Sequence, residues 1–219
     1  MAMRFIRVDV HRLKKSQGIN ELNSLDVYTS PRFLLREFFW LRLKILTYLI
    51  SKHTTDNSRV LDFGGGSGLM LPTLSRNFKN VFLVDRKIKN AKDVVSICNL
   101  LNVSLMESDI LQSEYPRGSF GAIIAADVLE HFSDVNLPIT KILEWLSNDG
   151  FLFTSLPTEN KFYELLRLIF KKQKPSDHFY SAKEVECFLE CSGFKKVDCI
   201  YHPLFVPILP LFNISVWKK

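Results

Sequence analysis

A glycine-rich segment that directly follows a short apolar run constrains the fold of this chain more than any other feature. Residues 60–68 read Val-Leu-Asp-Phe-Gly-Gly-Gly-Ser-Gly, and Val60 and Leu61 end an apolar run typical of a buried parallel strand. The glycines leave the following turn almost without side chains, so a ligand can lie directly against its backbone. Apolar residues from Leu69 to Leu74 then predict a helix whose first amides point back at the turn.

The spacing of these glycines distinguishes two kinds of nucleotide site. A dinucleotide-binding fingerprint requires Gly-x-Gly-x-x-Gly, in which the third glycine allows close packing of the helix. Counted from Gly64 or from Gly66, the sixth position is a leucine, so neither register fits. The pattern that does fit is Asp-x-Gly-x-Gly-x-Gly, from Asp62 to Gly68. Taken alone, the segment also fits a loop that binds no ligand.

Predicted strands and helices alternate through the middle of the chain. Strands are expected at 59–63, 81–85, 103–107, 120–126 and 150–155, with helices between them at 67–78, 88–100 and 137–147. This alternation predicts an α/β fold built of βαβ units, with right-handed crossovers and a parallel sheet. Ligands of such sheets bind beyond the carboxyl ends of the strands, near the point where the strand order reverses.

The N-terminal region is set apart from this alternating part. Ser30-Pro31 is typical of an N-cap followed by a first-turn proline, and the apolar residues that follow as far as Ile50 predict a long helix. A polar break at Thr54–Ser58 separates that helix from the first strand. We therefore expect residues 1–54 to form an N-terminal helical cap on a domain that occupies 55–219.

The C-terminal region adds one helix and two strands. Ser181 and Glu184 match a capping box, which predicts a helix at 181–192. A strand at 194–201 follows. Apolar residues then alternate with polar ones from Phe212 to Val216, and a period of two predicts a last strand, which we expect to be antiparallel.

Four segments agree, in order and spacing, with the class I methyltransferases that use S-adenosyl-L-methionine (SAM). They are 60–68, 81–86, 107–110 and 124–132, and the last resembles the stretch after the fourth strand in methyltransferases of quinone biosynthesis. Asn148-Asp149 would make the turn into the fifth strand. The resemblance, to the small-molecule type of this family, implies a three-layer Rossmann-like fold. Its mostly parallel seven-stranded sheet would have an antiparallel last strand, with SAM as methyl donor and S-adenosyl-L-homocysteine (SAH) as product.

Acidic side chains at the ends of predicted strands are the candidate cofactor ligands. Asp85 ends the second strand, where a carboxylate can accept hydrogen bonds from both ribose hydroxyls of an adenosine; NAD uses the same geometry. The alternative is that Asp85 is only a turn residue at the end of the strand and binds no ligand. The resemblance implies that Arg86 flanks the adenine, that Asp109 and Ile110 contact it, and that Asp127 borders the methionine end. The full set of expected SAM-site residues is Asp62, Gly64, Gly65, Gly66, Gly68, Asp85, Arg86, Asp109, Ile110 and Asp127.

Two histidines are the candidate catalytic residues. His131 lies one helical turn after Asp127, and a histidine near neutral pKa can take a proton from a substrate hydroxyl. His178 precedes the predicted helix at 181–192, in a segment that resembles the substrate side of the family. The alternative for both is a structural role, bracing a loop or bonding to backbone. Methyl transfer to an acceptor that is already nucleophilic needs little acid–base help, because SAM carries the activated methyl.

The cysteines do not predict a metal site. Cys98, Cys187, Cys191 and Cys199 include no Cys-x-x-Cys pair, and no histidines at ligand spacing accompany them. We expect reduced thiols in the cytoplasm and no bound metal. The N-terminus lacks the apolar core of a signal peptide, because charges recur every few residues, which agrees with a cytoplasmic location.

The net charge of +6 is unevenly distributed. Residues 1–54 carry 10 basic and 4 acidic side chains (+6), residues 55–156 carry 9 and 12 (−3), and residues 157–219 carry 10 and 7 (+3). Basic flanks fit an anionic substrate, a lipid headgroup or nucleic acid, and equally fit solvated lysine and arginine. Nucleic-acid methylation is disfavoured, because the place after the fourth strand reads Ala-Asp-Val-Leu and no RNA-binding module is present.

Two apolar stretches bear on the methyl acceptor. An insertion at about 157–180 contains a predicted apolar helix at 162–170 and would form a lid over the acceptor, and a second stretch spans 204–210. They favour a small-molecule or lipid-like acceptor and peripheral contact with a membrane. Core packing or a homodimer contact is the alternative for both. A protein that keeps the fold and binds SAM without catalysis is the competing hypothesis for the whole chain.

Overall fold

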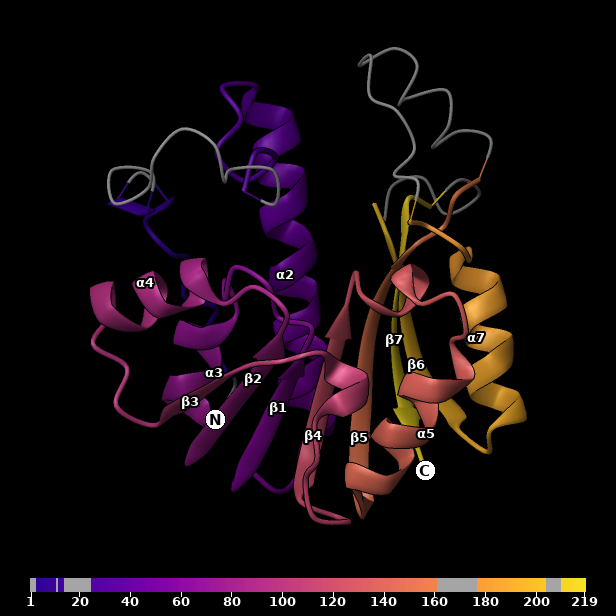
Figure 1. Cartoon of the computed structure of the whole chain (residues 1–219). Coiled ribbons are helices and arrows are strands. Elements are labelled where there is room, and N and C mark those ends of the chain that lie inside the picture. Colours follow the sequence, from indigo (N-terminus) through magenta and orange to yellow (C-terminus); the bar gives the residue numbers. More distant parts are fainter. Residues whose placement is uncertain (1–2, 11, 14–24, 161–176, 204–209) are drawn as a thin grey trace.

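The structure, a computed structural model, describes residues 3–10, 12–13, 25–160, 177–203 and 210–219 (Figure 1). A seven-stranded sheet forms its centre, with strand order β3-β2-β1-β4-β5-β7-β6. The strands are β1 (Arg59–Phe63), β2 (Asn80–Asp85), β3 (Val103–Glu107), β4 (Phe120–Ala126), β5 (Leu146–Pro157), β6 (Lys195–His202) and β7 (Phe212–Lys218). β7 runs antiparallel to both of its neighbours, and the other strands are parallel. The predicted α/β fold and its reversed last strand are confirmed.

Helices cover both faces of the sheet, which gives three layers (Figure 1). One apolar cluster joins α2 (Phe33–His53), α3 (Leu71–Asn77) and α4 (Lys89–Ile97) to one face. A second joins α5 (Asn136–Trp145) and α7 (Ala182–Cys191) to the other. Along β1, Val60 belongs to the first cluster, whereas Leu61 and Phe63 belong to the second. Such a strand is buried on both faces, which explains the near-continuous apolar run in the sequence.

Several predicted boundaries are wrong by a few residues, for identifiable reasons. The long N-terminal helix begins at Phe33 and not at Ser30-Pro31, because the Ser30 hydroxyl accepts a bond from the Arg32 amide (3.2 Å) in the turn before the helix. The helix after the glycine segment begins at Leu71, since 67–70 belong to the turn. The turn predicted at Asn148-Asp149 lies inside β5, at an irregularity where β5 pairs with β4.

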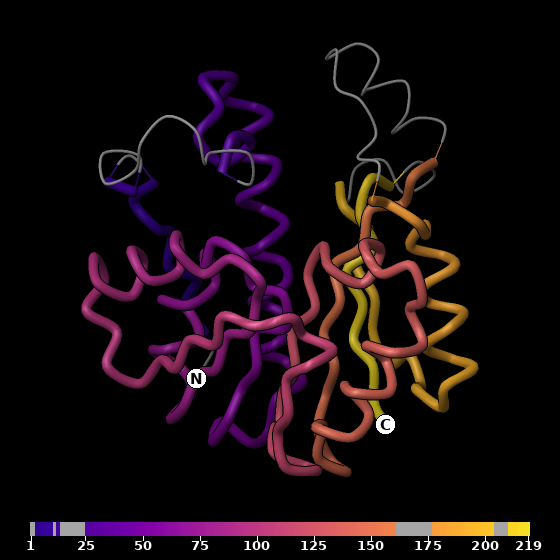
Figure 2. The backbone as a smooth tube through the Cα atoms, in the orientation of Figure 1, coloured from indigo at the N-terminus to yellow at the C-terminus, as the bar shows by residue number. Residues whose placement is uncertain are grey.

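The N-terminal helix packs as part of the main core. Its buried side chains, Leu43 and Leu46 among them, share one apolar cluster with Val60 of β1 and Ile214 of β7. The helix runs beside the sheet, and its N-terminal half rises beyond the carboxyl ends of β1 and β4 (Figure 2). Within the described residues, none of the helices combines the length and hydropathy needed to cross a bilayer.

The C-terminal helix carries its predicted cap. The Glu184 carboxylate accepts a bond from the Ser181 amide (2.8 Å), as in a capping box, and it also accepts one from the Ser181 hydroxyl (2.7 Å). Gly193 adopts a left-handed conformation (φ +98°) and ends the helix. The predicted apolar helix at 162–170 and the stretch at 204–209 lie outside the described residues.

Candidate functional site

The glycine-rich turn is a backbone surface shaped by its neighbours. Gly64 has φ +71°, and a Cβ there would overlap the side chain of Val128. Gly65 lies against Asp62, and Gly68 lies against Leu71 and Ala91 of the adjoining helices. Gly66 has φ +48° and faces open space, with 3.8 Å from its would-be Cβ to the Asp85 carboxylate. The turn is therefore packed from below and open above Gly66, where a ligand can approach.

Asp85, at the carboxyl end of β2, holds this turn in place. One carboxylate oxygen accepts a bond from the Gly66 amide (2.9 Å), and the other accepts one from the Lys87 amide (2.9 Å). An ionised carboxylate has about four acceptor positions. Asp85 can therefore hold the loop and still accept bonds from a ribose.

The next strand end forms a second wall. Asp109 caps the 3-10 helix η1 (Ile110–Gln112) by accepting the Leu111 amide (3.0 Å), and its other oxygen pairs with the Arg86 guanidinium (2.7 Å). The Ile110 side chain is buried beside them. Asp85, Arg86, Asp109 and Ile110 line one small cavity of about 130 Å³, which Val128, His131 and Phe132 close. Apolar and acidic groups thus meet where the resemblance implies an adenine.

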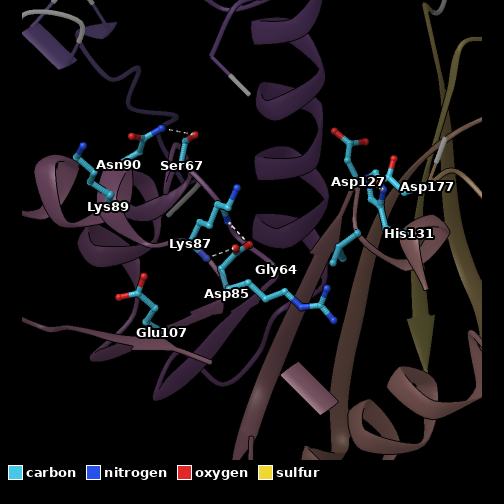
Figure 3. Close-up of a pocket in the computed structure, with 13 residues that line it drawn as sticks. Gly64, Ser67, Asp85, Lys87, Lys89, Asn90, Glu107, Asp127, His131 and Asp177 are labelled. Carbon is cyan, nitrogen blue, oxygen red and sulfur yellow. Dashed lines mark hydrogen bonds and ion pairs between the residues drawn. The ribbon is translucent and has the colours of Figure 1, made fainter. Parts of the chain in front are cut away.

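A larger cavity of about 800 Å³ joins these strand ends to the end of β4 (Figure 3). Its volume falls within the range of roughly 300–1,000 Å³ found for small-molecule sites. It opens where the strand order reverses, between β1 and β4. Its lining residues are Gly64, Gly66, Ser67, Asp85, Arg86, Lys87, Lys89, Asn90, Glu107, Asp127, Val128, His131 and Asp177.

Asp127 directly follows β4 and is held by a buried arginine. It adopts a left-handed conformation (φ +53°), which aspartate tolerates better than most residues, and its amide donates to the Ser155 carbonyl (2.9 Å). One carboxylate oxygen is ion-paired with Arg42, whose guanidinium also donates to the Tyr28 hydroxyl (2.7 Å) and to Ser155 Oγ (3.3 Å). The other oxygen is buried without a hydrogen-bond partner. The strand tip therefore presents one uncommitted acceptor.

The two candidate histidines lie together at this end of the cavity. His131, in the 3-10 helix η2 (Leu129–His131), and His178 form an edge-to-face ring pair, with centroids 4.6 Å apart. Nδ1 of His178 is 2.9 Å from a carboxylate oxygen of Glu159. Nδ1 of His131 lies 3.0 Å from an oxygen of Asp177. His131 lines the cavity, whereas His178 lies behind it, mostly buried.

Two buried carboxyl groups have raised pKa values. Burial, with Asp85 nearby, raises the pKa of Asp62 to about 7. Glu130 is fully buried, neither of its carboxylate oxygens has a partner, and burial followed by the charge of Asp127 raises its pKa well above the ordinary range. An oxygen of Glu130 and a ring nitrogen of each histidine, His131 and His178, all lie within 4.8 Å of one another.

Most of the predicted site residues line one or both of the two cavities. Asp62, Gly65 and Gly68 line neither cavity and instead support the glycine turn, and His178 lies behind His131. Arg42 was not identified as a site residue in the sequence analysis. Its position among the apolar residues of a long helix could have indicated a buried ion pair. Glu159 and Asp177, which the fold brings to the histidines, were also not identified.

Comparison with known proteins agrees with this arrangement. A family model described as a methyltransferase domain matches residues 34–198. The chain therefore belongs to the methyltransferase domain family, as the sequence motifs predicted.

Relatives of several kinds are similar to the chain. (S)-Coclaurine N-methyltransferase of Papaver somniferum is 29% identical over 64% of this chain and 41% of its own length. The mitochondrial ubiquinone biosynthesis O-methyltransferase of Bos taurus is 26% identical over 66% of this chain and 44% of its own. The chain thus spans less than half the length of these two relatives.

A solved structure shows the same fold. The N-methyltransferase NodS from Bradyrhizobium japonicum WM9, in complex with SAH, superimposes with a TM-score of 0.66 at 17% identity. The likeness covers 95% of this chain and 97% of that one. At this identity it establishes the Rossmann-like methyltransferase fold.

Proposed function

We propose that this chain binds SAM in the 800 Å³ cavity and transfers its methyl group to a small-molecule or lipid-like acceptor. The observation that carries the proposal is the meeting of the glycine turn with the ends of β2 and β4 around that one cavity. Membership of the methyltransferase domain family supports it. The competing hypothesis is a protein that binds SAM without turnover.

The lining residues fit the parts of SAM in order. Asp85 would accept the ribose hydroxyls beside the open backbone of Gly66. Asp109 and Ile110, in the smaller cavity, suit the adenine. The uncommitted oxygen of Asp127 suits the amino group of the methionine end. When bound, SAM supplies a methyl group activated by its sulfonium, so the protein mainly has to orient the acceptor.

His131 is the proposed proton acceptor for the methylated group. It lines the cavity, and its position beside Asp177 would stabilise an imidazolium. His178 supports it from behind, because the Glu159 carboxylate fixes one of its ring nitrogens. The proposed place of action is the cytoplasm, and contact with a membrane or with a second copy of the chain remains a prediction of the sequence.

Calorimetry with SAM, SAH and NAD tests the cofactor. We expect SAM and SAH to bind at micromolar concentration and NAD not to bind. Binding of NAD without SAH would contradict the proposal. Release of SAH from SAM in the presence of a cell extract then separates an enzyme from a non-catalytic binding protein, since the latter binds SAM without consuming it.

A further inference from the structure

The two ends of the large cavity differ in charge. At the end nearest β2, three basic residues, Arg86, Lys87 and Lys89, line the cavity together with the acidic residues Asp85 and Glu107, and Lys87 lies beside Asp85 (Figure 3). At the β4 end, the ionisable lining residues within the described part of the chain are Asp127, His131 and Asp177. Arg86 reaches the smaller cavity beside His131, but its guanidinium is ion-paired there with Asp109 (2.7 Å). The methyl acceptor, which approaches the methionine end of SAM, therefore meets carboxylates and imidazoles.

Two further acidic residues, Glu130 and Glu159, lie behind the cavity wall. Glu130 is fully buried, its carboxylate has no partner, and one of its oxygens lies within 4.8 Å of the ring nitrogens of His131 and His178. The Glu159 side chain is 5% exposed and contacts His178. An unpartnered buried carboxyl group is costly, so its retention beside two imidazoles points to a proton or a cation that it serves.

Among the described residues, the permanent cation packed against this group is Arg42, and it is already committed. Arg42 is 3% exposed, and its guanidinium is shared by Asp127, Tyr28 and Ser155. Four carboxyl groups, those of Asp127, Glu130, Glu159 and Asp177, thus face one arginine and two histidines. Even with Glu130 protonated, three carboxylates outnumber the single arginine while the histidines are neutral.

We propose that the methyl acceptor is an amine, which enters this end of the cavity as an ammonium ion. The inference rests on the proposed methyltransferase function and specifies its substrate class. The ammonium proton passes to the imidazole of His131, where the Asp177 carboxylate stabilises the resulting charge. The freed nitrogen lone pair forms the new N–C bond to the methyl carbon, and the electron pair of the breaking S–C bond stays on sulfur as the thioether of SAH.

An oxygen acceptor suits this environment poorly. A phenol or alcohol becomes nucleophilic by losing a proton, and the oxyanion that develops would lie among carboxylates. Stabilising it would need a cation, and the lysines and arginine that line the described cavity lie at the other end. An amine instead loses positive charge as it becomes nucleophilic, so no anion develops among the carboxylates.

Matched amine and alcohol probes test the inference. Calorimetry on the SAH-saturated protein would compare benzylamine with benzyl alcohol, 2-phenylethylamine with 2-phenylethanol, and dodecylamine with dodecanol. We expect at least one amine to bind about tenfold or more tightly than its alcohol. Asp177→Asn, which removes an exposed carboxylate, should weaken binding of that amine about two- to fivefold. SAH affinity should be unchanged.

Asp149→Asn provides the control, since it removes the same charge from a side chain that is 96% exposed at the far end of β5. It should leave amine affinity unchanged. Equal binding of amines and alcohols, or SAH binding without any amine binding, would overturn the inference and leave the methyltransferase proposal standing. An O-methyl product found by mass spectrometry would do the same. Failure of SAH to bind would remove the proposed function itself.

Discussion

At the scale of the residue, two glycines of one turn serve different purposes and can be separated by mutation. Gly64→Ala places a Cβ against Val128 at φ +71°, so we expect both strain and overpacking, about 2–4 kcal/mol of stability. In Gly66→Ala the new Cβ meets its nearest atom at 3.8 Å, so the only expected cost is that of holding alanine in the left-handed conformation, roughly 1–2 kcal/mol of stability. Urea unfolding measures both. Because Gly66 faces the cavity, its variant should lose SAH affinity while still folded. Equal stability losses would contradict this account.

Asp85 is expected to contribute to cofactor binding both directly and through the turn. Asp85→Ala removes the acceptor for a ribose and frees the amides of Gly66 and Lys87. We expect SAH affinity to fall about tenfold to a hundredfold, because a hydrogen bond to a charged group contributes roughly 1.5–3 kcal/mol. Calorimetry checks this. Asp85→Asn keeps one acceptor and should lie between wild type and Asp85→Ala.

Glu107→Gln is the matched control for Asp85, because Glu107 ends the neighbouring strand, lines the same cavity and pairs only at the surface with Lys92. Its SAH affinity should stay near that of wild type. Unchanged affinity in Asp85→Ala would place the adenosine elsewhere in the molecule.

At the scale of the element, Arg42 attaches the long N-terminal helix to the tips of β4 and β5. Arg42→Met leaves the Asp127 carboxylate without its partner. We expect the unfolding free energy to fall by about 3 kcal/mol, which is the lower end of the range for broken buried ion pairs, because the Asp127 side chain is 35% exposed. The double variant Arg42→Met, Asp127→Asn removes the stranded charge and should recover part of that loss. Denaturant unfolding of the single and double variants gives the coupling energy.

Arg36 supplies the control on the same helix. It pairs with Glu37 near the surface, so Arg36→Met should cost no more than about 1 kcal/mol. If both arginine variants lost the same stability, Arg42 would not be the residue that anchors the helix. A double variant that is no more stable than Arg42→Met would show that Asp127 bears no uncompensated charge.

The elements themselves could be predicted from the sequence because each follows from local pattern. β4 was predicted with its exact bounds, since a strand buried on both faces is an unbroken apolar run. The start of α2 was missed because Ser30 and Pro31 fit a turn as well as a helix start. The cofactor-side residues end neighbouring parallel strands, so their meeting was predictable. Glu159 and Asp177 approach the histidines only through the fold, which no local pattern encodes.

At the scale of the whole molecule, the charge of a chain segment does not give the charge of its site. The net charge of +6 resides in the terminal regions, yet the acceptor end of the cavity is acidic. The acids there come from the tip of β4, in a segment of net charge −3, and from residues 159 and 177, in a segment of net charge +3. Substrate class therefore depends on which few charges the topology gathers at one strand end.

Global stability should depend on pH through Asp62. Its pKa is raised from 3.8 to about 7, so between these values the folded chain holds a proton that the unfolded chain has released. This stabilisation is complete below the unfolded value and is lost as pH rises through about 7. His202 acts in the opposite sense: burial lowers its pKa from 6.5 to about 4, so its contribution is lost as pH falls through about 4.

Comparison with Asp62→Asn isolates the first contribution, because His202 is present in both proteins and cancels. The unfolding free energy of wild type, relative to that of Asp62→Asn, should fall between about pH 4 and pH 7, by no more than about 4 kcal/mol, and stay level at higher pH. Urea unfolding at steps of about one pH unit measures it. A difference that is constant over this window would mean that Asp62 is ionised beneath the glycine turn. The turn would then carry a buried negative charge close to the sulfonium-bearing ligand, and SAM should bind more tightly than SAH, which lacks the sulfonium charge.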